Sequence, residues 1–443
     1  MSGEDLRELC DSGDLPPLRS WLGEQPPHVI AAELSRLPTE SMAVPFRLLE
    51  KTRALKVFEE LDPVHQQHVL TGLRDEHFQQ LVEDMDPDDR AALVGEVPAK
   101  VANRVLAGLS PQERRATAAL LGYPESSVGR VMTPEAIALH RNRTVAMALE
   151  VVRAKGADAE TVYTLLVVDD GRALLGVVSL RALVTSSPER TLDELVDASI
   201  APVQATDEAE SAARLMRDAN LLALPVVDSE KRVLGLLTID DAIEVIEAAD
   251  TEDVQRQAAT APLGRPYLSA SVPALARSRS VWLLLLIIAA TLTVNVLQFF
   301  EDNLEQVSAL ALFIPLITGT GGNAGSQAAT SVVRAIAIGE VRPADLLRVA
   351  WRESRVGSLL GVGLALIGLL IGTIFVGFHV AVVVGVALIA VCAWAATVGG
   401  AMPLLAKRFN VDPAVVSAPM VTTLVDATGL VIYFVTARLV LGI

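Results

Sequence analysis

The sequence predicts a multi-domain protein that combines an α-helical superhelical N domain, an α/β pair of repeated units and an α-helical transmembrane bundle of five spans. Three observations support this prediction. Apolar residues recur every twelve positions near the start, a strand pattern returns after 59 residues, and the last third consists of long apolar runs. Because 443 residues exceed what one compact core usually holds, several domains are expected. We place them at residues 1–127, 128–190, 191–249, 250–279 and 280–443.

The composition excludes several classes of protein. A formal net charge of −16 argues against a nucleic-acid partner, which would require a basic face. The two cysteines, Cys10 and Cys392, offer neither a disulfide framework nor a zinc site. The acidic start is followed by no apolar segment, so we expect no signal peptide and a cytoplasmic soluble half. No nucleophile and base stand in a recognisable arrangement, so we predict that the chain is not an enzyme.

The N domain, residues 1–127, is predicted from its repeat. The apolar positions spaced by twelve residues are Leu37, Leu49, Leu61, Leu73, Met85, Val97, Leu109 and Leu121. Every second one opens a turn that contains proline. Asp62, Asp86 and Ser110 precede three of these prolines, and they are good N-cap residues for helices that begin with proline. The pattern therefore predicts short helix pairs stacked into an array.

A second repeat covers residues 128–249. An apolar strand at 163–169 and a second strand through glycine at 175–179 return at 224–228 and 234–238. Each copy ends in a hydroxyl residue at the start of a helix. Together with the leading sequence Val-Met-Thr-Pro at 131–134, this pattern resembles a pair of CBS domains.

The resemblance to CBS pairs implies a two-fold regulatory module, often with a cleft for an adenine nucleotide such as ATP. Arg181, Thr238 and Asp241 fall in the usual cleft, whereas Ala182 stands where the first copy would carry an acid. ATP binding and a purely structural pair therefore remain alternatives.

Residues 280–443 contain five apolar spans. They run over 281–300, 306–333, two parts of 356–406 divided near Gly377, and 413–437. Basic residues cluster before the first span and in every second loop, whereas the loop at 301–305 has none. This pattern predicts a multi-pass protein of the cell membrane with its N-terminal half in the cytoplasm and its C-terminus outside.

Asp426 is a carboxylate within the last span. Such a charge costs roughly 2.5–3.5 kcal/mol on insertion scales, and no basic residue lies at a similar depth to compensate it. Thr422 and Thr423 one turn earlier add hard oxygen atoms, which suit Mg²⁺ or Ca²⁺ rather than zinc or copper. We therefore interpret Asp426 as part of an ion pathway.

The second span contains a glycine-rich sequence at 316–327. Glycines at 319, 321, 322 and 325 predict a broken helix whose free carbonyls, with the amides of Asn323 and Gln327, line a wet cavity. The alternative is a kinked, closely packed helix. A phosphate-binding loop is disfavoured because no lysine follows the glycines.

A row of acids precedes the membrane part. Asp241, Glu244, Glu247, Asp250 and Asp253 recur at every third position, with Glu252 beside them. Such neighbours on a helix repel one another unless they are solvated or bridged by cations. Both readings are open, and the position of the row next to the spans favours ion sensing.

The order of these parts, together with the sequences Gly-Thr-Gly-Gly-Asn-Ala-Gly-Ser-Gln and Thr-Thr-Leu-Val-Asp-Ala-Thr-Gly, resembles the MgtE-type magnesium channels over essentially the whole chain. The resemblance implies a homodimer in the lipid bilayer, with a pore lined by the second and fifth spans. The pore-lining set that it implies is Gly321, Gly322, Asn323, Gln327, Ala418 and Thr422, with Asp426 holding the selected ion.

The resemblance also implies that cytoplasmic Mg²⁺ binds acids between the soluble parts and closes the pore. The matching acids are Asp88, Glu208, Glu210, Asp241, Glu244, Glu252 and Asp253, with Asp412 at the inner mouth. The chain departs from the family pattern at Lys56, Ala92, Ala182, Ala249 and Ala418. We predict a channel that imports Mg²⁺ and is closed by cytoplasmic Mg²⁺. A broader divalent-cation transporter and a nucleotide-regulated anion channel are the alternatives.

Overall fold

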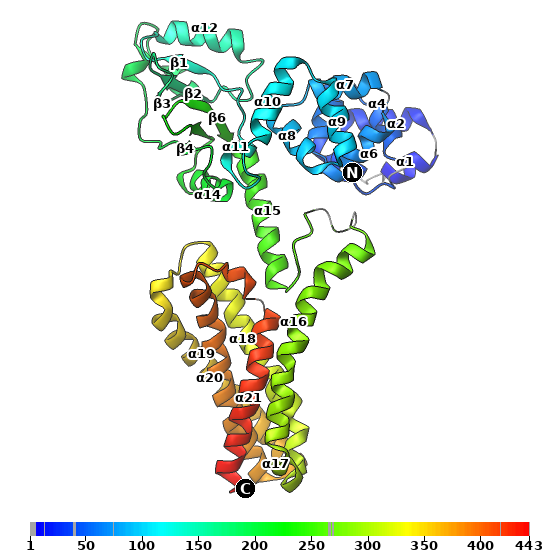
Figure 1. The fold of residues 1–443 in the computed structure, drawn as a ribbon, viewed down its shortest axis with the longest axis vertical. Helices are drawn as coiled ribbons and strands as arrows, with labels where there is room; N and C mark the ends of the chain where they lie inside the picture. Colours follow the sequence, from blue (N-terminus) through cyan, green and yellow to red (C-terminus); the bar gives the residue numbers. More distant parts are fainter. Residues whose placement is uncertain are drawn as a thin grey trace. The chain divides into compact units, whose positions relative to one another are not determined.

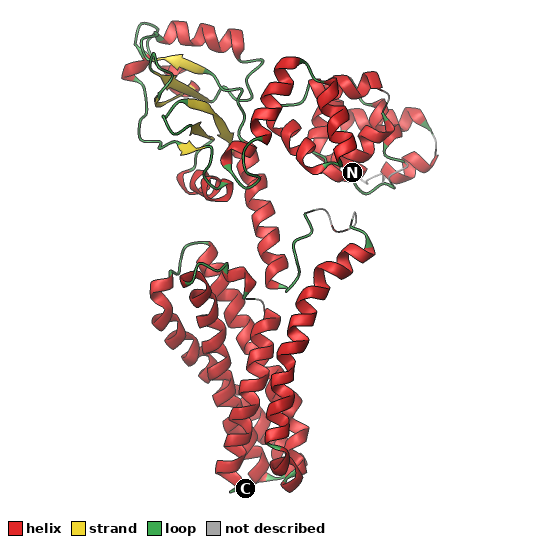
Figure 2. Cartoon of the chain, in the orientation of Figure 1, coloured by secondary structure: helices red, strands yellow, loops and turns green. Residues whose placement is uncertain are grey.

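The computed structural model describes residues 6–12, 14–38, 41–73, 75–264, 267, 270–416 and 418–442. The chain forms two compact units, Met1–Ala249 and Asp250–Ile443, which we describe separately (Figures 1 and 2). The first unit contains the helical N domain and the α/β pair. The second unit is α-helical.

The N domain is a stack of short helices, as the twelve-residue repeat predicts. They are α1 (Leu6–Ser12), α2 (Leu15–Glu24), α3 (Pro27–Leu34), α4 (Ala43–Leu48), α5 (Lys51–Glu59), α6 (Pro63–Gly72), α7 (Asp75–Glu83), α8 (Pro87–Glu96), α9 (Ala99–Gly108) and α10 (Pro111–Leu121). The turn-opening residues Leu37, Leu61, Met85 and Leu109 are buried in one hydrophobic core. The repeat thus marks core positions between successive helices.

The predicted N-caps differ in how they are used. Asp62 accepts hydrogen bonds from the backbone amides of Val64 and His65, at 3.0 and 3.2 Å. Ser110 forms a reciprocal capping box with Glu113 at the start of α10. Asp86 occupies the N-cap position of α8, but its side chain makes no capping hydrogen bond. The carboxylate of Asp86 belongs instead to an acidic cluster described below.

The α/β pair contains two copies with the same register. The first comprises α11 (Val128–Val131), β1 (Ala138–His140), α12 (Val145–Lys155), β2 (Thr164–Val168), β3 (Leu174–Ser179) and α13 (Leu180–Thr185). The second comprises β4 (Val203–Gln204), α14 (Ala209–Ala219), β5 (Ala223–Val227), β6 (Val233–Thr238) and α15 (Ile239–Gln257). In each sheet the first strand is parallel and the third antiparallel to the middle one. The pairs Thr164 with Ser179 and Ala223 with Thr238 stand 59 residues apart, which confirms the repeat.

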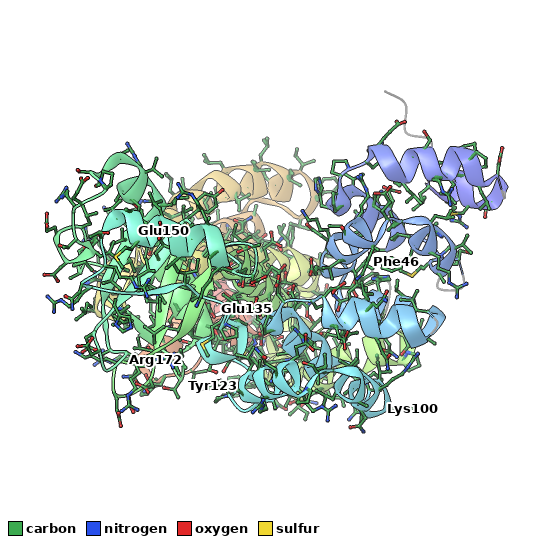
Figure 3. The ribbon with its side chains drawn as sticks, turned by 90° about the horizontal axis from the view of Figure 1, so that it is seen from above. Phe46, Lys100, Tyr123, Glu135, Glu150 and Arg172 are labelled. Carbon is green, nitrogen blue, oxygen red and sulfur yellow. The ribbon has the colours of Figure 1, made fainter. Side chains whose placement is uncertain are left out.

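Backbone hydrogen bonds connect the two copies next to Gly235. The segment that leads into the first copy crosses to the second, where Thr133 exchanges two backbone hydrogen bonds with Leu236. A Cβ atom on Gly235 would lie 2.1 Å from the carbonyl oxygen of Thr133. Glycine is therefore required there, and the crossing brings Thr133 near the start of α15. In the view of Figure 3, Tyr123 and Glu135 lie between the N domain, where Phe46 and Lys100 are labelled, and the α/β pair.

The second unit begins within α15 and continues through a set of long helices. These are α16 (Val272–Phe299), α18 (Ile314–Ala337), α19 (Leu346–Val376), α20 (Phe378–Arg408) and α21 (Ala418–Leu441), with the short α17 (Glu301–Gln306) after the first. Gly377, with φ at 91°, divides α19 from α20, where the sequence predicts a turn.

Among the described residues, four helices are long and apolar enough to cross a membrane: α16, α19, α20 and α21. The fifth predicted span, α18, has 24 residues but is less apolar because of its glycine, threonine, asparagine and glutamine residues. It nevertheless packs within the helical unit near both of its ends. Near its start, Leu310 accepts a hydrogen bond from Tyr433 of α21, and near its end Arg334 lies 3.6 Å from Asp250.

The prediction of a broken second span is wrong, because the glycine-rich segment lies within the continuous helix α18. Close packing explains the glycines. A Cβ atom on Gly325 would lie 3.0 Å from a methyl group of Val421 on α21 and 3.2 Å from the carbonyl oxygen of Ala395 on α20. Gly399 of α20 is tighter still, since its Cβ would lie 2.1 Å from the carbonyl oxygen of Gly325. Small residues thus let three helix backbones approach one another. The irregular backbone comes earlier, in the 3-10 segment Ser308–Phe313.

Candidate metal centres

Asp88, Glu160 and Asp241 form the most buried acidic cluster of the first unit. Asp88 lies in the first turn of α8, Glu160 in the loop between α12 and β2, and Asp241 in the first turn of α15. One carboxylate oxygen from each lies within 4.8 Å of the others. Asp88 is only 6% exposed, and its Oδ1 accepts no hydrogen bond from any described residue; the same holds for the buried Oε2 of Glu160. Such buried acceptors are costly unless something pairs with them.

Three ionised carboxylates are electrostatically unfavourable in this cluster. Burial, with the neighbouring charges of Asp241 and Glu160, raises the pKa of Asp88 well above its usual range. Burial raises the pKa of Asp241 to about 8, although the hydroxyl of Thr238 donates a hydrogen bond to that carboxylate. Burial also raises the pKa of Glu160, although hydrogen bonding from the Thr133 and Thr238 hydroxyls opposes this shift. A divalent cation would neutralise the cluster and supply the missing partners.

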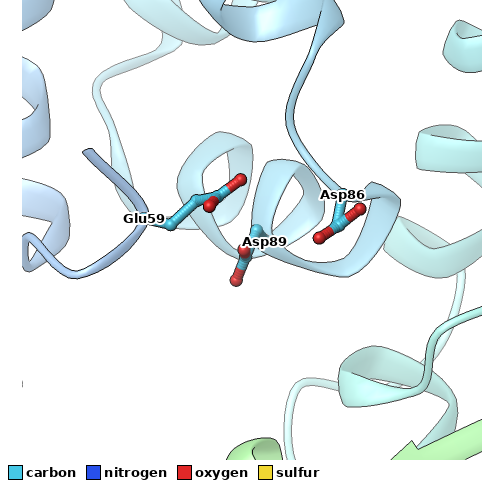
Figure 4. Close-up of side chains that lie close together, drawn as sticks. All are labelled: Glu59, Asp86 and Asp89. Carbon is cyan, nitrogen blue, oxygen red and sulfur yellow. The ribbon is translucent and has the colours of Figure 1, made fainter. Parts of the chain in front are cut away.

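A second cluster lies on the same helix start and contains Glu59, Asp86 and Asp89 (Figure 4). Glu59 ends α5, Asp86 precedes α8, and Asp89 lies in its first turn. Their ligand atoms lie within 4.8 Å of one another. Burial and mutual repulsion raise the pKa of Glu59 to about 8 and that of Asp89 to about 7. Three of the six acids in the two clusters thus come from one short run, Asp86–Asp89.

Sequence reasoning identified Asp88 and Asp241 but missed Glu59, Asp86, Asp89 and Glu160. A local signal existed for two of them, because Asp-Pro-Asp-Asp at 86–89 is unusually acidic for a helix start. Asp86 was instead interpreted only as an N-cap. No local signal marks Glu59 or Glu160, which reach the clusters through tertiary packing.

The other predicted sensor acids lie elsewhere or have partners. Glu208 accepts a hydrogen bond from Ser211 at 2.9 Å, and Glu210 pairs with Arg214 at 2.7 Å, on α14 and its N-cap. Glu244 is exposed on α15, although partial desolvation and the charge of Asp240 raise its pKa. In the second unit, Arg256 pairs with both Glu252 and Asp412. Asp253 follows Glu252 on the same helix.

The predicted pore residues lie on facing helices of the second unit. Asp426 is half-buried on α21, and Thr422 one turn earlier shares a hydrogen bond of 2.9 Å with Ser326 of α18. Ser326 also donates to the backbone carbonyl of Ala418, at 3.3 Å. Asn323 and Gln327 are exposed on α18. The roles of these residues in a pore stay predictions.

Gly321 and Gly322 are buried between helices. A Cβ atom on Gly321 would lie 2.7 Å from Val391, and one on Gly322 would lie 2.7 Å from Thr422. These two positions therefore set how closely α18 approaches α20 and α21, and through this spacing they fix where Thr422 stands. Whether they also line a pore stays a prediction.

The residues predicted to hold a nucleotide lie in different copies of the α/β pair. Thr238 is 4% exposed and is bonded to Asp241, which itself belongs to the buried cluster. Arg181 is exposed on α13 of the other copy. ATP binding by these residues stays a prediction.

Comparison with known proteins finds matches for the N domain, the α/β pair and most of the helical unit. Family models match the MgtE intracellular N domain at residues 25–126, CBS domains at 128–189 and 192–248, and the MgtE divalent cation transporter at 314–436. The magnesium transporter MgtE of Thermus thermophilus is 38% identical over 98% of both chains, and that of Bacillus subtilis is 29% identical over 96% of this chain and 94% of its own.

Solved structures agree with these matches. The cytosolic domain of the Mg²⁺ channel MgtE in complex with ATP is similar with a TM-score of 0.52 and 33% identity, over 54% of this chain and 98% of the other. The soluble part of a magnesium transporter gives a TM-score of 0.50 and 25% identity, over 55% of this chain and 96% of the other. The chain therefore belongs to the MgtE family of magnesium transporters.

Proposed function

We propose that the chain is a homodimeric, Mg²⁺-selective channel that imports Mg²⁺ across the cell membrane and closes when cytoplasmic Mg²⁺ fills its acidic sites. The observation that carries the regulatory part is the pair of carboxylate clusters around α8. Buried like charges that repel one another disfavour the compact arrangement in the absence of cations. A bound ion reverses this preference, so it stabilises the conformation in which the clusters are closed.

The pore part of the proposal rests on Asp426. It is the ninth residue of the 24-residue helix α21, about 12 Å along its axis, and forms no ion pair with a basic side chain of the described residues. A hydrated Mg²⁺ ion requires few direct protein ligands, because Mg²⁺ gives up its water reluctantly. One carboxylate from each of two subunits, with threonine hydroxyls nearby, would supply the charge that attracts the ion.

The orientation that we propose places the α17 end of the bundle outside. Arg438, near the end of α21, donates to the side-chain oxygen of Asn303 in α17, at 3.0 and 3.2 Å. The C-terminal end of α21 and the segment at 301–306 therefore lie at one end of the bundle. Membrane-impermeant labelling of cysteines introduced at the exposed positions Asp302 and Gly442 should proceed from outside for both. Labelling of either from the cytoplasmic side would contradict the orientation.

The transport proposal is tested with purified protein in liposomes that contain a Mg²⁺ dye. We expect Asp426→Ala to abolish most of the Mg²⁺ flux and Asp426→Asn to weaken discrimination against monovalent ions. Glu301→Gln, which removes an exposed acid at the α17 end, is the control and should leave flux unchanged. Wild-type flux in a folded Asp426→Ala protein would contradict the pore assignment, and equal flux of Ca²⁺ or Co²⁺ would favour the broader transporter.

We also propose that ATP binds the CBS pair. The support is the resemblance to CBS pairs, which implies that Thr238 and Asp241 fall in the usual nucleotide cleft, and the similarity to a cytosolic domain solved with ATP. Because Asp241 belongs to the acidic cluster, a triphosphate there would need a cation between itself and the carboxylates. Calorimetric titration with ATP should therefore give tighter binding with Mg²⁺ than without, and no binding in either condition would leave the pair purely structural.

A further inference from the structure

We propose that Glu160 is the third protein ligand of a divalent-cation site that it forms with Asp88 and Asp241. This inference deepens the regulatory function proposed above and rests on it. Two observations carry it independently of the acidity of the cluster. The side chain of Asp88 is 94% buried with an unpartnered oxygen, and the buried Oε2 of Glu160 is likewise unpartnered among the described residues. Both belong to the group whose ligand atoms lie within 4.8 Å of one another.

The spacing fits a hard divalent cation. Mg²⁺ binds oxygen at about 2.0–2.1 Å, so opposite ligands in an octahedral shell are about 4.2 Å apart; for Ca²⁺, at about 2.3–2.6 Å, the separation is about 5 Å. Three oxygens within 4.8 Å can therefore surround such an ion with small side-chain rotations. Glu160 and Asp241 are only partly buried, which leaves room for the water molecules that complete the shell.

In the described part of the chain, no basic side chain takes the place of a metal ion in this cluster. Arg90 is buried nearby, and its charge acts on Asp88. However, its Nη2 donates a hydrogen bond to the backbone carbonyl of Met85 at 2.6 Å, and its Nη1 pairs with Glu113 at 3.9 Å. Among the described residues, Arg90 therefore makes no hydrogen bond or ion pair with the three carboxylates. The hydroxyl of Thr238 donates to Asp241, which orients that carboxylate but adds no positive charge.

The three proposed ligands come from different parts of the first unit. Asp88 belongs to the N domain, Glu160 to the first CBS copy, and Asp241 to α15 of the second copy. A single ion bound to all three would tie together every part of the first unit. Asp88 and Asp241 alone would connect the N domain only to α15, so Glu160 decides whether the first CBS copy takes part in sensing Mg²⁺.

The test is the thermal unfolding of the full-length protein in detergent, titrated with MgCl₂ at constant ionic strength against NaCl. Glu160→Gln keeps the size of the side chain, and Glu150→Gln removes an exposed acid of α12 in the same copy as the matched control. We expect Glu160→Gln to raise the Mg²⁺ concentration for the half-maximal shift in Tm about tenfold or more, while Glu150→Gln titrates like wild type. In EDTA, Glu160→Gln should be at least as stable as wild type, because it removes a repelling charge.

The outcomes separate this inference from the proposed function. If Asp88→Asn raises the half-maximal concentration and Glu160→Gln does not, Glu160 is not a ligand and the regulatory proposal stands without it. If Mg²⁺ does not stabilise even the wild type, both proposals fail. A Glu160→Gln protein that is less stable than wild type in EDTA would show that the carboxylate makes a stabilising contact within the protein, and this would also overturn the inference.

Discussion

Replacing Asp241 by asparagine should stabilise the protein in the absence of divalent cations. Asp241 has two carboxylate neighbours, Asp88 and Glu160, with ligand atoms within 4.8 Å. Two full charges at that distance repel by about 3.5 kcal/mol at an effective dielectric constant of about 20. Protonation limits this cost. With a pKa of about 8, Asp241 is mostly protonated at pH 7 in the folded state, whereas protonating a carboxyl of ordinary pKa 3.8 at that pH costs about 4 kcal/mol, which is the upper limit of the destabilisation.

Asparagine keeps the shape and the oxygen that accepts the hydrogen bond from Thr238, but it carries no charge. Allowing for the cost of burying an amide, we expect a gain of about 2–4 kcal/mol in the free energy of unfolding of the first unit in EDTA. For a unit of this size, that gain corresponds to a rise in Tm of about 5–15 °C. The same variant should lose most of its stabilisation by Mg²⁺, because a ligand has been removed.

Differential scanning fluorimetry of the full-length protein in detergent, with EDTA or with saturating MgCl₂, measures both effects. Asp170→Asn is the control, because the Asp170 side chain is 99% exposed in the same CBS copy as Glu160. It should change neither Tm nor the response to Mg²⁺. The reasoning is refuted if Asp241→Asn is less stable than wild type in EDTA, or if it is stabilised by Mg²⁺ as strongly as wild type.

Two further predictions concern pH and helix packing. In EDTA, the free energy of unfolding of the first unit should fall as pH rises from about 5 to 8. The raised pKa values of Asp241, Glu59 and Asp89 make the folded state bind more protons than the unfolded state in this window. Saturating Mg²⁺ should remove this dependence, and a free energy of unfolding that rises with pH in EDTA would contradict the assignment. Gly361→Ala should destabilise the helical unit by about 1–3 kcal/mol, because the added Cβ would lie 2.6 Å from Cα of Ile389. The control is Gly363→Ala, whose Cβ meets nothing within 4 Å and which should be neutral or slightly stabilising. Equal melting temperatures of the two purified variants would refute this packing argument.

The features that the sequence predicted well depend on local, periodic signals. The twelve-residue spacing of Leu61, Met85 and Leu109 reports burial between successive helices, and all three residues are in the core. The strand repeat likewise has the same register and the same irregularity in both copies, between Val167 and Val168 and between Val226 and Val227. Periodicity survives folding because each element buries the face that its sequence makes apolar.

The glycine-rich segment shows where local reasoning fails. Glycine lowers helix propensity in isolation, and this led to the expectation of a broken span. In the bundle, the backbone of α18 gains close contacts with α20 and α21 that side chains would prevent, as at Gly325. Tertiary packing therefore outweighs propensity, and the glycines mark a close helix contact rather than a break.

The acidic clusters were only half visible for a related reason. Asp88 and Asp241 were identified through the family resemblance, but Glu160 lies in a loop without periodicity, and Glu59 ends a helix whose sequence is otherwise ordinary. Each reaches its cluster because the chain brings α5, α8, the loop before β2 and α15 together. Contacts between residues far apart in the chain leave no local pattern in a single sequence, whereas the structure gives them directly as distances.

The distribution of counter-charges indicates which of the predicted sensor acids depend most on an added ion. Glu252 and Asp412 share the guanidinium of Arg256, and Glu210 is paired with Arg214. A metal ion at those acids must compete with a cation that the chain already supplies. The clusters around α8 have raised carboxylate pKa values, which is the mark of negative charge that the protein leaves uncompensated. We therefore expect Mg²⁺ binding to contribute the most free energy at these clusters, and neutralisation of Asp88 or Asp241 to shift the Mg²⁺ dependence of closure more than neutralisation of Glu210.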